Sequence, residues 1–222
     1  RPEGKFVAVP GFAMASSDSA TITVRGKGGH GAMPQEAVDP VVAASSIVMA
    51  LQTIVSRNVP PLHTGIVTVG AFLAGDAPNV IPGTAELRLT VRAMQPTVRD
   101  LLERRIAELA HAQAASYGAT ADVNYIRRYP VLNNTPEHTD FCKQLVRDWL
   151  GDDGLVTNPE PVTASEDFAF FLEKVPGCYV FIGNGEGNDG GCMVHNPGYD
   201  FNDRVLPTGA SYWVRLAETF LA

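Results

Sequence analysis

Apolar and polar residues alternate along several short stretches in the first half of the chain. Residues 85–92 show this most clearly, because Ala, Leu, Leu and Val would face inward while the charged and Thr positions between them face outward. Residues 20–25 and 121–125 alternate in the same way, and residues 66–72 are rich in β-branched side chains. The pattern therefore predicts four strands between residues 20 and 126.

Two helices are predicted between these strands. Asp39-Pro40 opens the first, because Asp caps a helix and Pro fits its first turn. Pro96 begins the second, and Gly118 is its predicted C-terminal stop. We expect the buried stripe of the first helix to run through Val38, Val41, Val42, Ser45, Val48, Met49, Gln52 and Val55.

The resulting order, β-α-β-β-α-β, is that of the ferredoxin-like fold, in which a four-stranded antiparallel sheet carries two helices on one face. We predict that residues 18–127 form such a domain. Residues 1–17 and 128–222 would belong to a second domain of the α/β class, separated in sequence by the first. The predicted fold class is therefore α/β with an inserted α+β domain.

The second predicted domain is poor in strands. Helices are expected at 137–150 and 208–221, with one short apolar strand at 178–182. These elements are too few to close a core, so we expect the partner strands to lie in a part of the protein outside this sequence. The chain also opens on Arg1 without a starting Met, and we expect it to be part of a longer protein.

Composition narrows the classes of function. The net charge of −7 argues against a nucleic-acid partner, and no apolar run approaches the roughly 20 residues needed to span a membrane. The three cysteines are an odd count at unrelated spacings, which is typical of free thiols in a reducing compartment. No signal peptide is visible, so we expect a cytoplasmic protein.

A loop at residues 190–203 is the most informative stretch. It carries His195 among glycines, turn formers and carboxylates, and a neutral imidazole in such a loop is a common metal ligand. One histidine is not a metal site, since catalytic zinc usually takes three protein ligands. His63, His111 and His138 show no ligand spacing and are expected to be solvated, and Cys192 is expected to be a packed or free thiol.

Three further stretches allow both a structural and a functional interpretation. The loop Gly28–Pro34 around His30 is either a plain turn or a place where the backbone approaches a ligand. Asn79, between Pro78 and Pro82, is either part of a connector or an amide that holds a substrate. Ser165 is expected to cap a helix, and Glu166 and Asp167 either stabilise its first turn or orient ligands beside a metal.

Taken together, these motifs resemble one family. Five stretches occur in the same order, and the resemblance covers essentially the whole chain: Arg25–Pro34, Ala37–Pro40, Pro78–Pro82, Ser165–Phe168 and His195–Asp203. The sequence resembles the metal-dependent aminoacylase and carboxypeptidase family, in its hippurate hydrolase and indoleacetyl-amino-acid hydrolase branch.

The resemblance implies a catalytic domain with two divalent metal ions (zinc, manganese, cobalt or nickel) and an inserted ferredoxin-like lid that forms a homodimer. His195 matches the last metal ligand of the family. His30 matches a lid histidine that stabilises the tetrahedral oxyanion in the partner subunit's site, and Asn79 matches a residue that holds the substrate. The implied reaction is hydrolysis of the amide bond of small N-acyl amino acids.

The chain also departs from the family pattern. The other metal ligands of this branch are a Cys-x-His motif, a Glu-Glu pair and a further His, and none of these is present in the matching order. One of those glutamates is the catalytic base. We therefore expect the chain by itself to be inactive, and a non-catalytic dimerisation or binding module remains the alternative.

Overall fold

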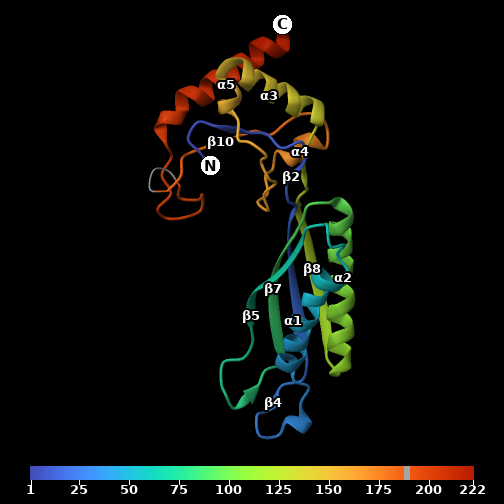
Figure 1. Cartoon of the computed structure of the whole chain (residues 1–222). Coiled ribbons are helices and arrows are strands. Elements are labelled where there is room, and N and C mark those ends of the chain that lie inside the picture. Colours follow the sequence, from blue (N-terminus) through green and yellow to red (C-terminus); the bar gives the residue numbers. More distant parts are fainter. Residues whose placement is uncertain (188–190) are drawn as a thin grey trace. The chain divides into compact units, whose positions relative to one another are not determined.

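The computed structural model describes residues 1–187 and 191–222 and divides them into two compact units (Figure 1). Unit 1 comprises residues 1–13, 132–162 and 168–222, and unit 2 comprises residues 14–131 and 163–167. Gly190, the first residue of the predicted ligand loop, lies outside the described residues.

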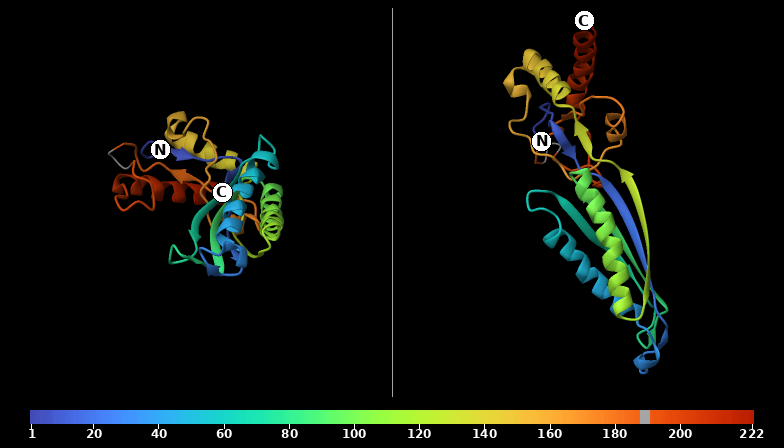
Figure 2. Two further views of the ribbon diagram at one scale, coloured as in Figure 1. Left: turned by 90° about the horizontal axis from the view of Figure 1, so that it is seen from below. Right: turned by 90° about the vertical axis from the view of Figure 1, so that its right-hand side faces the viewer.

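Unit 2 is built on a four-stranded sheet with the strand order β5-β7-β3-β8. All neighbouring strands are antiparallel, and α1 and α2 cover one face (Figures 1 and 2). The six elements are β3 (Ser17–Arg25), α1 (Pro40–Arg57), β5 (Gly65–Leu73), β7 (Thr84–Ala93), α2 (Pro96–Ser116) and β8 (Thr120–Tyr129). This is the predicted βαββαβ arrangement, which the strand pairing confirms.

The core of unit 2 lies between the sheet and the two helices. Ile22 at the middle of β3 pairs with Leu87 of β7 and with Val123 of β8, so one layer of apolar side chains crosses the sheet. Leu102 and Ile106 of α2 are fully buried above this layer. The strand alternation read from the sequence thus places the apolar side chains on the helix-covered face.

The buried face of α1 differs from the prediction. Its buried side chains are Ala43, Ala44, Ile47, Leu51 and Ile54, whereas Val42 is 49% exposed and Met49 is 71% exposed. The predicted stripe was therefore wrong at Val42 and Met49, although Val38, Val48 and Val55 pack against the core. Ile47, Leu51 and Ile54 follow a spacing of four and three residues, and the two alanines next to them let the helix approach the sheet. By length and hydropathy α1 could cross a membrane, but a single helix of this kind is weak evidence for a membrane span, and 33% of it is buried within the protein.

One buried carboxylate connects three elements of unit 2. Asp18 on β3 accepts hydrogen bonds from Nε and Nη2 of Arg99 at 2.9 and 2.6 Å, from the Tyr125 hydroxyl at 2.9 Å and from the backbone N–H of Arg128 at 3.1 Å. The Asp18 side chain is 0% exposed. Burial, together with the negative charge of Asp18, raises the pKa of Tyr125 above its usual value, so the hydroxyl keeps its proton as a donor.

We predict that Arg99→Ala destabilises unit 2 by about 3–5 kcal/mol, because it leaves the Asp18 carboxylate buried without its cation. The control is Arg104→Ala on the same helix, which removes only an exposed pair with Glu108 and should cost less than about 1 kcal/mol. Tryptophan fluorescence would report on unit 1, because Trp149 and Trp213 lie there. The stability of unit 2 in both variants is therefore measured by hydrogen exchange of the β3 amides in urea. Equal effects would contradict the prediction.

In its described residues, unit 1 contains two small strand pairings and three α-helices. β1 (Phe6–Val7) pairs with β10 (Phe181–Ile182), and β2 (Gly11–Met14), whose last residue belongs to unit 2, pairs with β9 (Leu132–Asn134). The helices are α3 (Pro136–Leu150), α4 (Ala169–Leu172) and α5 (Leu206–Leu221), with short 3-10 turns at Asp152–Gly154 and Asp203–Val205. Phe6, Leu145, Val146 and Tyr212 form the centre of its core.

Two local predictions in the second half of the chain were wrong. The predicted strand at 178–182 is reduced to β10, because the Asn134 side chain binds both the N–H and the C=O of Tyr179 and so takes the groups a strand ladder would use. Ser165 caps no helix. Its hydroxyl lies 3.5 Å from the Arg92 guanidinium, and α4 begins later, with Phe168 at the N-cap.

Candidate functional site

Two loops of unit 2 bring His30 and Asn79 together. β4 (Gly29–His30) pairs with β6 (Val80–Ile81), with His30 opposite Val80. The backbone N–H of Gly31 also donates to the C=O of Asn79 at 2.8 Å. The two candidate residues lie about 50 positions apart in sequence, and this small antiparallel pairing makes them neighbours. β4 lies at one end of the unit 2 sheet (Figure 1).

The His30 side chain is oriented by its own loop. Its Nδ1 atom accepts a hydrogen bond from the backbone N–H of Ala32 at 3.0 Å. An imidazole nitrogen that accepts carries no proton, so in neutral His30 this hydrogen bond assigns the proton to Nε2. The residue is exposed, and its Nε2–H is therefore the donor that the loop presents. This is the tautomer that an oxyanion donor requires.

The glycines of the His30 loop are required by close backbone contacts. A Cβ atom on Gly31 would lie 3.0 Å from the carbonyl oxygen of Asn79, and one on Gly28 would lie 2.9 Å from that of Ile81. A Cβ on Gly26 would lie 2.1 Å from the carbonyl oxygen of Val38. These contacts involve backbone rather than flexible side chains, so the Gly-rich sequence is explained by the packing of the loop against its neighbours.

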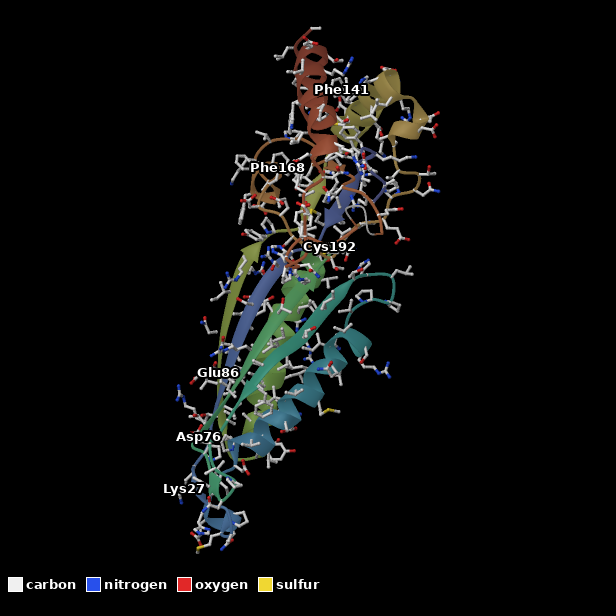
Figure 3. All side chains as sticks on the ribbon, turned by 90° about the vertical axis from the view of Figure 1, so that its left-hand side faces the viewer. Lys27, Asp76, Glu86, Phe141, Phe168 and Cys192 are labelled. Carbon is white, nitrogen blue, oxygen red and sulfur yellow. The ribbon has the colours of Figure 1, made fainter. Side chains whose placement is uncertain are left out.

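The loop is also fixed at its start. The backbone N–H and C=O of Lys27 exchange hydrogen bonds of 2.8 and 2.9 Å with Val38, directly before the cap of α1. The cap itself forms as predicted, because the Asp39 carboxylate accepts from the N–H groups of Val41 and Val42. Lys27 and Asp76 lie at this end of unit 2, so charges of both signs lie near the site (Figure 3).

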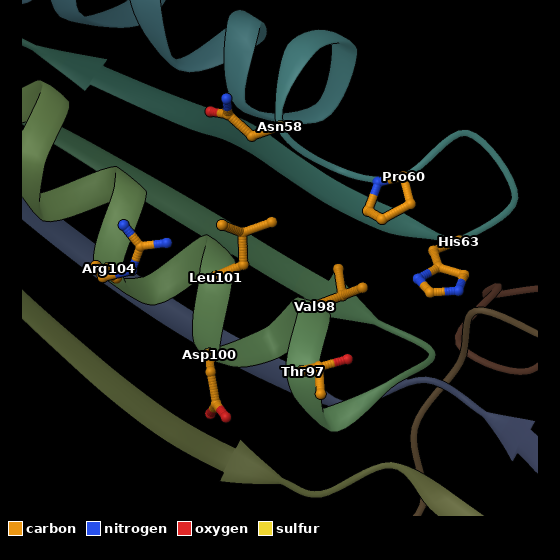
Figure 4. A pocket seen from close by; sticks show the side chains of 8 residues that line it. All are labelled: Asn58, Pro60, His63, Thr97, Val98, Asp100, Leu101 and Arg104. Atoms are coloured by element: carbon orange, nitrogen blue, oxygen red, sulfur yellow. The ribbon is translucent and has the colours of Figure 1, made fainter.

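A cavity of about 490 Å³ in unit 2 belongs to the other end of α1 (Figure 4). It is lined by Asn58, Pro60, His63, Thr97, Val98, Asp100, Leu101 and Arg104. Since α1 runs for 18 residues from the His30 end to this one, the helix rise separates the two places by about 25 Å. His63 is exposed, as expected from the sequence, and the cavity is not part of the His30 site.

His195 lies in a loop of unit 1 that two asparagines hold in place. The backbone of His195 has φ of 67°, a left-handed conformation that is uncommon for a residue with a side chain. Asn184 donates to the C=O of Asp200 at 3.0 Å and accepts from the N–H of Asn202 at 2.8 Å. Sequence reasoning missed this bracing. The two asparagines at either end of a glycine-rich stretch are the signal that could have revealed it.

The described residues do not complete a metal site. Among them, no three His, Cys, Asp or Glu side chains are placed to hold one ion. His195 therefore stands as a single candidate ligand in unit 1, and Cys192 close to it in sequence is a free thiol. Glu166 and Asp167 belong to unit 2, where the N–H of Asp167 donates to the Glu166 carboxylate at 3.1 Å. Their role beside a metal stays a prediction.

Comparison with known proteins identifies the family. The model of peptidase family M20/M25/M40 matches residues 5–219, and the chain belongs to this family. Hippurate hydrolase of Campylobacter jejuni is 40% identical over 98% of the chain. The match covers 56% of that relative, and the chain spans about half the length of the curated relatives it matches.

Solved structures support the fold. A protein from methicillin-resistant Staphylococcus aureus superimposes with a TM-score of 0.88 and 31% identity, over 100% of this chain and 57% of that protein. A Bacillus subtilis protein described as a dinuclear metal-binding peptidase of the M20 family superimposes with a TM-score of 0.77 and 27% identity, over 97% of this chain and 53% of that protein. The mixed α/β architecture of the chain is therefore that of M20 peptidases.

We predict that Gly31→Ala opens the pairing between the His30 and Asn79 loops, because the new methyl group would meet the backbone of Asn79. Overpacking of this kind costs about 1–3 kcal/mol, so the hydrogen-exchange protection of the amide at position 31 should fall by about 5- to 150-fold. Gly83→Ala is the matched control, since a Cβ there meets nothing within 4 Å. Unchanged protection in Gly31→Ala would show that the loop tolerates a side chain.

Proposed function

We propose that the chain carries the lid and the C-terminal part of the catalytic domain of a cytoplasmic, metal-dependent hydrolase that cleaves the amide bond of small N-acyl amino acids. The observation that carries this proposal is the His30 loop. It pairs with the Asn79 loop and presents an Nε2–H donor in a chain that is 40% identical to a hippurate hydrolase. The relatives that the chain matches include a hippurate hydrolase and a carboxypeptidase, and we propose the first kind of activity.

In this proposal unit 2 is the lid, inserted into the catalytic domain that unit 1 represents. His30 donates its Nε2–H to the oxyanion that forms when water adds to the amide carbonyl, and the side-chain amide of Asn79 holds the substrate next to it. The hydrogen bond from Ala32 keeps the imidazole in the required tautomer before substrate arrives. Preorganised donors stabilise the transition state without reorganising during the reaction.

The two divalent metal ions of the proposed enzyme need more ligands than the described residues provide. A metal ion is held by several converging ligands, and in our proposal this chain supplies one of them, His195. The surface of unit 1 supports the view that further chain completes the domain. Of the sixteen residues of α5 only Tyr212 is buried, while Trp213 is 67% exposed and Phe220 is 61% exposed.

We further propose that the lid forms a homodimer through α1 and the neighbouring edge strand β5. The exposed face of α1 includes Val42 and Met49 and has no charged side chain before Arg57, whereas α2 is lined with charges that pair with one another. An uncharged exposed face next to an open sheet edge fits an interface between two copies. α1 and β5 pack against each other in unit 2.

We predict that Met49→Glu makes the chain monomeric, because it places a charge at the centre of the uncharged face of α1. His111→Glu, on the exposed face of α2, should leave the dimer intact. Sedimentation velocity at high micromolar concentration measures both. A monomeric wild-type chain, or a dimer that survives in Met49→Glu, would contradict the proposed interface.

We predict that His30→Ala in the whole protein lowers kcat by about 10²–10³-fold with little change in KM, since an oxyanion donor acts on the transition state. Mixing this variant with a His195→Ala variant should restore part of the activity, because a mixed dimer contains one site with both histidines. Hydrolysis of hippurate and of N-acetyl amino acids is the assay. Mixed dimers that form but stay inactive would show that His30 does not act across the dimer.

A further inference from the structure

The strand pairing at the His30 loop places an apolar side chain directly beside the imidazole. His30 on β4 lies opposite Val80 on β6, in an antiparallel pairing of two short strands. Residues that lie opposite each other in such a pairing point to the same face of the sheet. Val80 is therefore the cross-strand neighbour of His30.

The backbone hydrogen bonds show how close these two side chains come. The N–H of Gly31, which follows His30, donates at 2.8 Å to the C=O of Asn79, which precedes Val80. A bond in this place identifies His30 and Val80 as a non-hydrogen-bonded pair, the type in which opposite side chains are closest. The Cβ atoms of directly opposite residues are about 4.5–5.5 Å apart, so the methyl groups of Val80 lie beside the imidazole.

Val80 is not needed for the packing of unit 2. It is 54% exposed, and among the described residues it does not belong to the core of unit 2. Met33 is also exposed, at 49%, and its N–H donates at 2.8 Å to the C=O of His30, which closes the turn after the imidazole. The imidazole thus has one exposed apolar side chain on the opposite strand and another in its own turn.

The chemistry of an N-acyl amino acid decides which part of the substrate suits this apolar neighbour. This step rests on the proposed function, in which His30 donates to the oxyanion at the amide carbon. That carbon carries the acyl group on one side and, on the other, the nitrogen of an amino acid with a charged carboxylate. Apolar methyl groups would remove water from a carboxylate without replacing its hydrogen bonds, which is unfavourable. The same methyl groups are stabilised when an apolar acyl group covers them.

We propose that Val80 is a specificity-determining residue, and that its methyl groups contact the acyl group of the substrate whose oxyanion His30 stabilises. An acetyl group ends at a single methyl and offers little surface for this contact. A benzoyl group extends further and covers Val80 with an apolar ring. The site therefore favours benzoyl over acetyl groups. Because His30 and Val80 belong to the same strand pairing, the lid carries the oxyanion donor and the acyl contact together.

The test compares hydrolysis of N-benzoylglycine and N-acetylglycine by the whole protein, since these substrates differ only in the acyl group. Val80→Thr exchanges one methyl group for a hydroxyl and keeps a β-branched side chain, which suits a strand equally well. We expect the ratio of kcat/KM for the benzoyl substrate to that for the acetyl substrate to fall by about 10-fold. One apolar carbon in a binding site changes selectivity by this order.

Ile126→Thr is the matched control. Ile126 is also β-branched, is 45% exposed and lies on β8, a strand of unit 2. It is opposite Ser19, and the length of β3 from Ser19 to Arg25 separates it from the start of the His30 loop by about 20 Å. The ratio should not change in this variant.

Two further measurements separate selectivity from loop structure. Hydrogen-exchange protection of the Gly31 amide should be the same in Val80→Thr as in the wild type, because the pairing of the two loops is kept. Val80→Ile adds one methylene to the contact and should hold the ratio at or above the wild-type value. If protection falls in Val80→Thr, the result for Val80→Ile decides.

The outcomes distinguish the role of Val80 from the proposed function. A wild-type protein that prefers the acetyl substrate, an unchanged ratio in Val80→Thr, an equal fall in Ile126→Thr, or a lower ratio in Val80→Ile would overturn the role of Val80 alone. A wild-type protein that hydrolyses neither substrate would overturn the proposed function, and the role of Val80 with it.

Discussion

The buried carboxylate of Asp18 is the interaction on which the arrangement of unit 2 depends. It lies near the start of the central strand β3 and binds α2 through Arg99 and β8 through Tyr125 and the backbone of Arg128. A carboxylate without exposure to water is costly unless its oxygens are bonded, and here both oxygens accept two hydrogen bonds. The network therefore fixes where α2 and β8 lie relative to β3, and removing one partner affects all three elements.

The same strand carries the constraint to the His30 site. β3 ends at Arg25, and the chain then makes the close contacts of Gly26 with Val38 and of Gly31 with Asn79 before α1 begins. The position of the imidazole is set by a rigid strand on one side and a capped helix on the other. A donor placed in this way needs little rearrangement to meet a charged intermediate. This is the physical basis for the proposed role of a surface loop in catalysis.

Unit 1 has a different balance of forces. Its core is small and aromatic, with Phe6 and Tyr212 in contact at a ring distance of 4.9 Å, and much of the apolar surface of α5 remains exposed. Local hydrogen bonds compensate where extended strands are lacking, as Asn134 shows by binding both backbone groups of Tyr179. In both units, polar side chains that hydrogen-bond to backbone groups fix the loops that carry the candidate site residues.

The sequence by itself determined the order of elements in unit 2, because strand alternation, the Asp39 cap and the Gly118 stop are local signals that act within a few residues. It also identified the family through five motifs in order, and it selected His30 and Asn79 as candidates. It did not determine which face of α1 is buried. Both faces are apolar, and only packing against the sheet selects Ile47, Leu51 and Ile54 over Val42 and Met49.

Tertiary structure alone decided the contacts between residues far apart in sequence. The pairing of His30 with the Asn79 loop and the binding of Asp18 by Arg99 leave no mark in local periodicity. Ser165 shows the same limit, since its sequence suits a helix cap but its hydroxyl lies next to Arg92 instead. A sequence pattern reports what a segment favours alone, whereas the bonds its polar groups make depend on which partners the fold brings near.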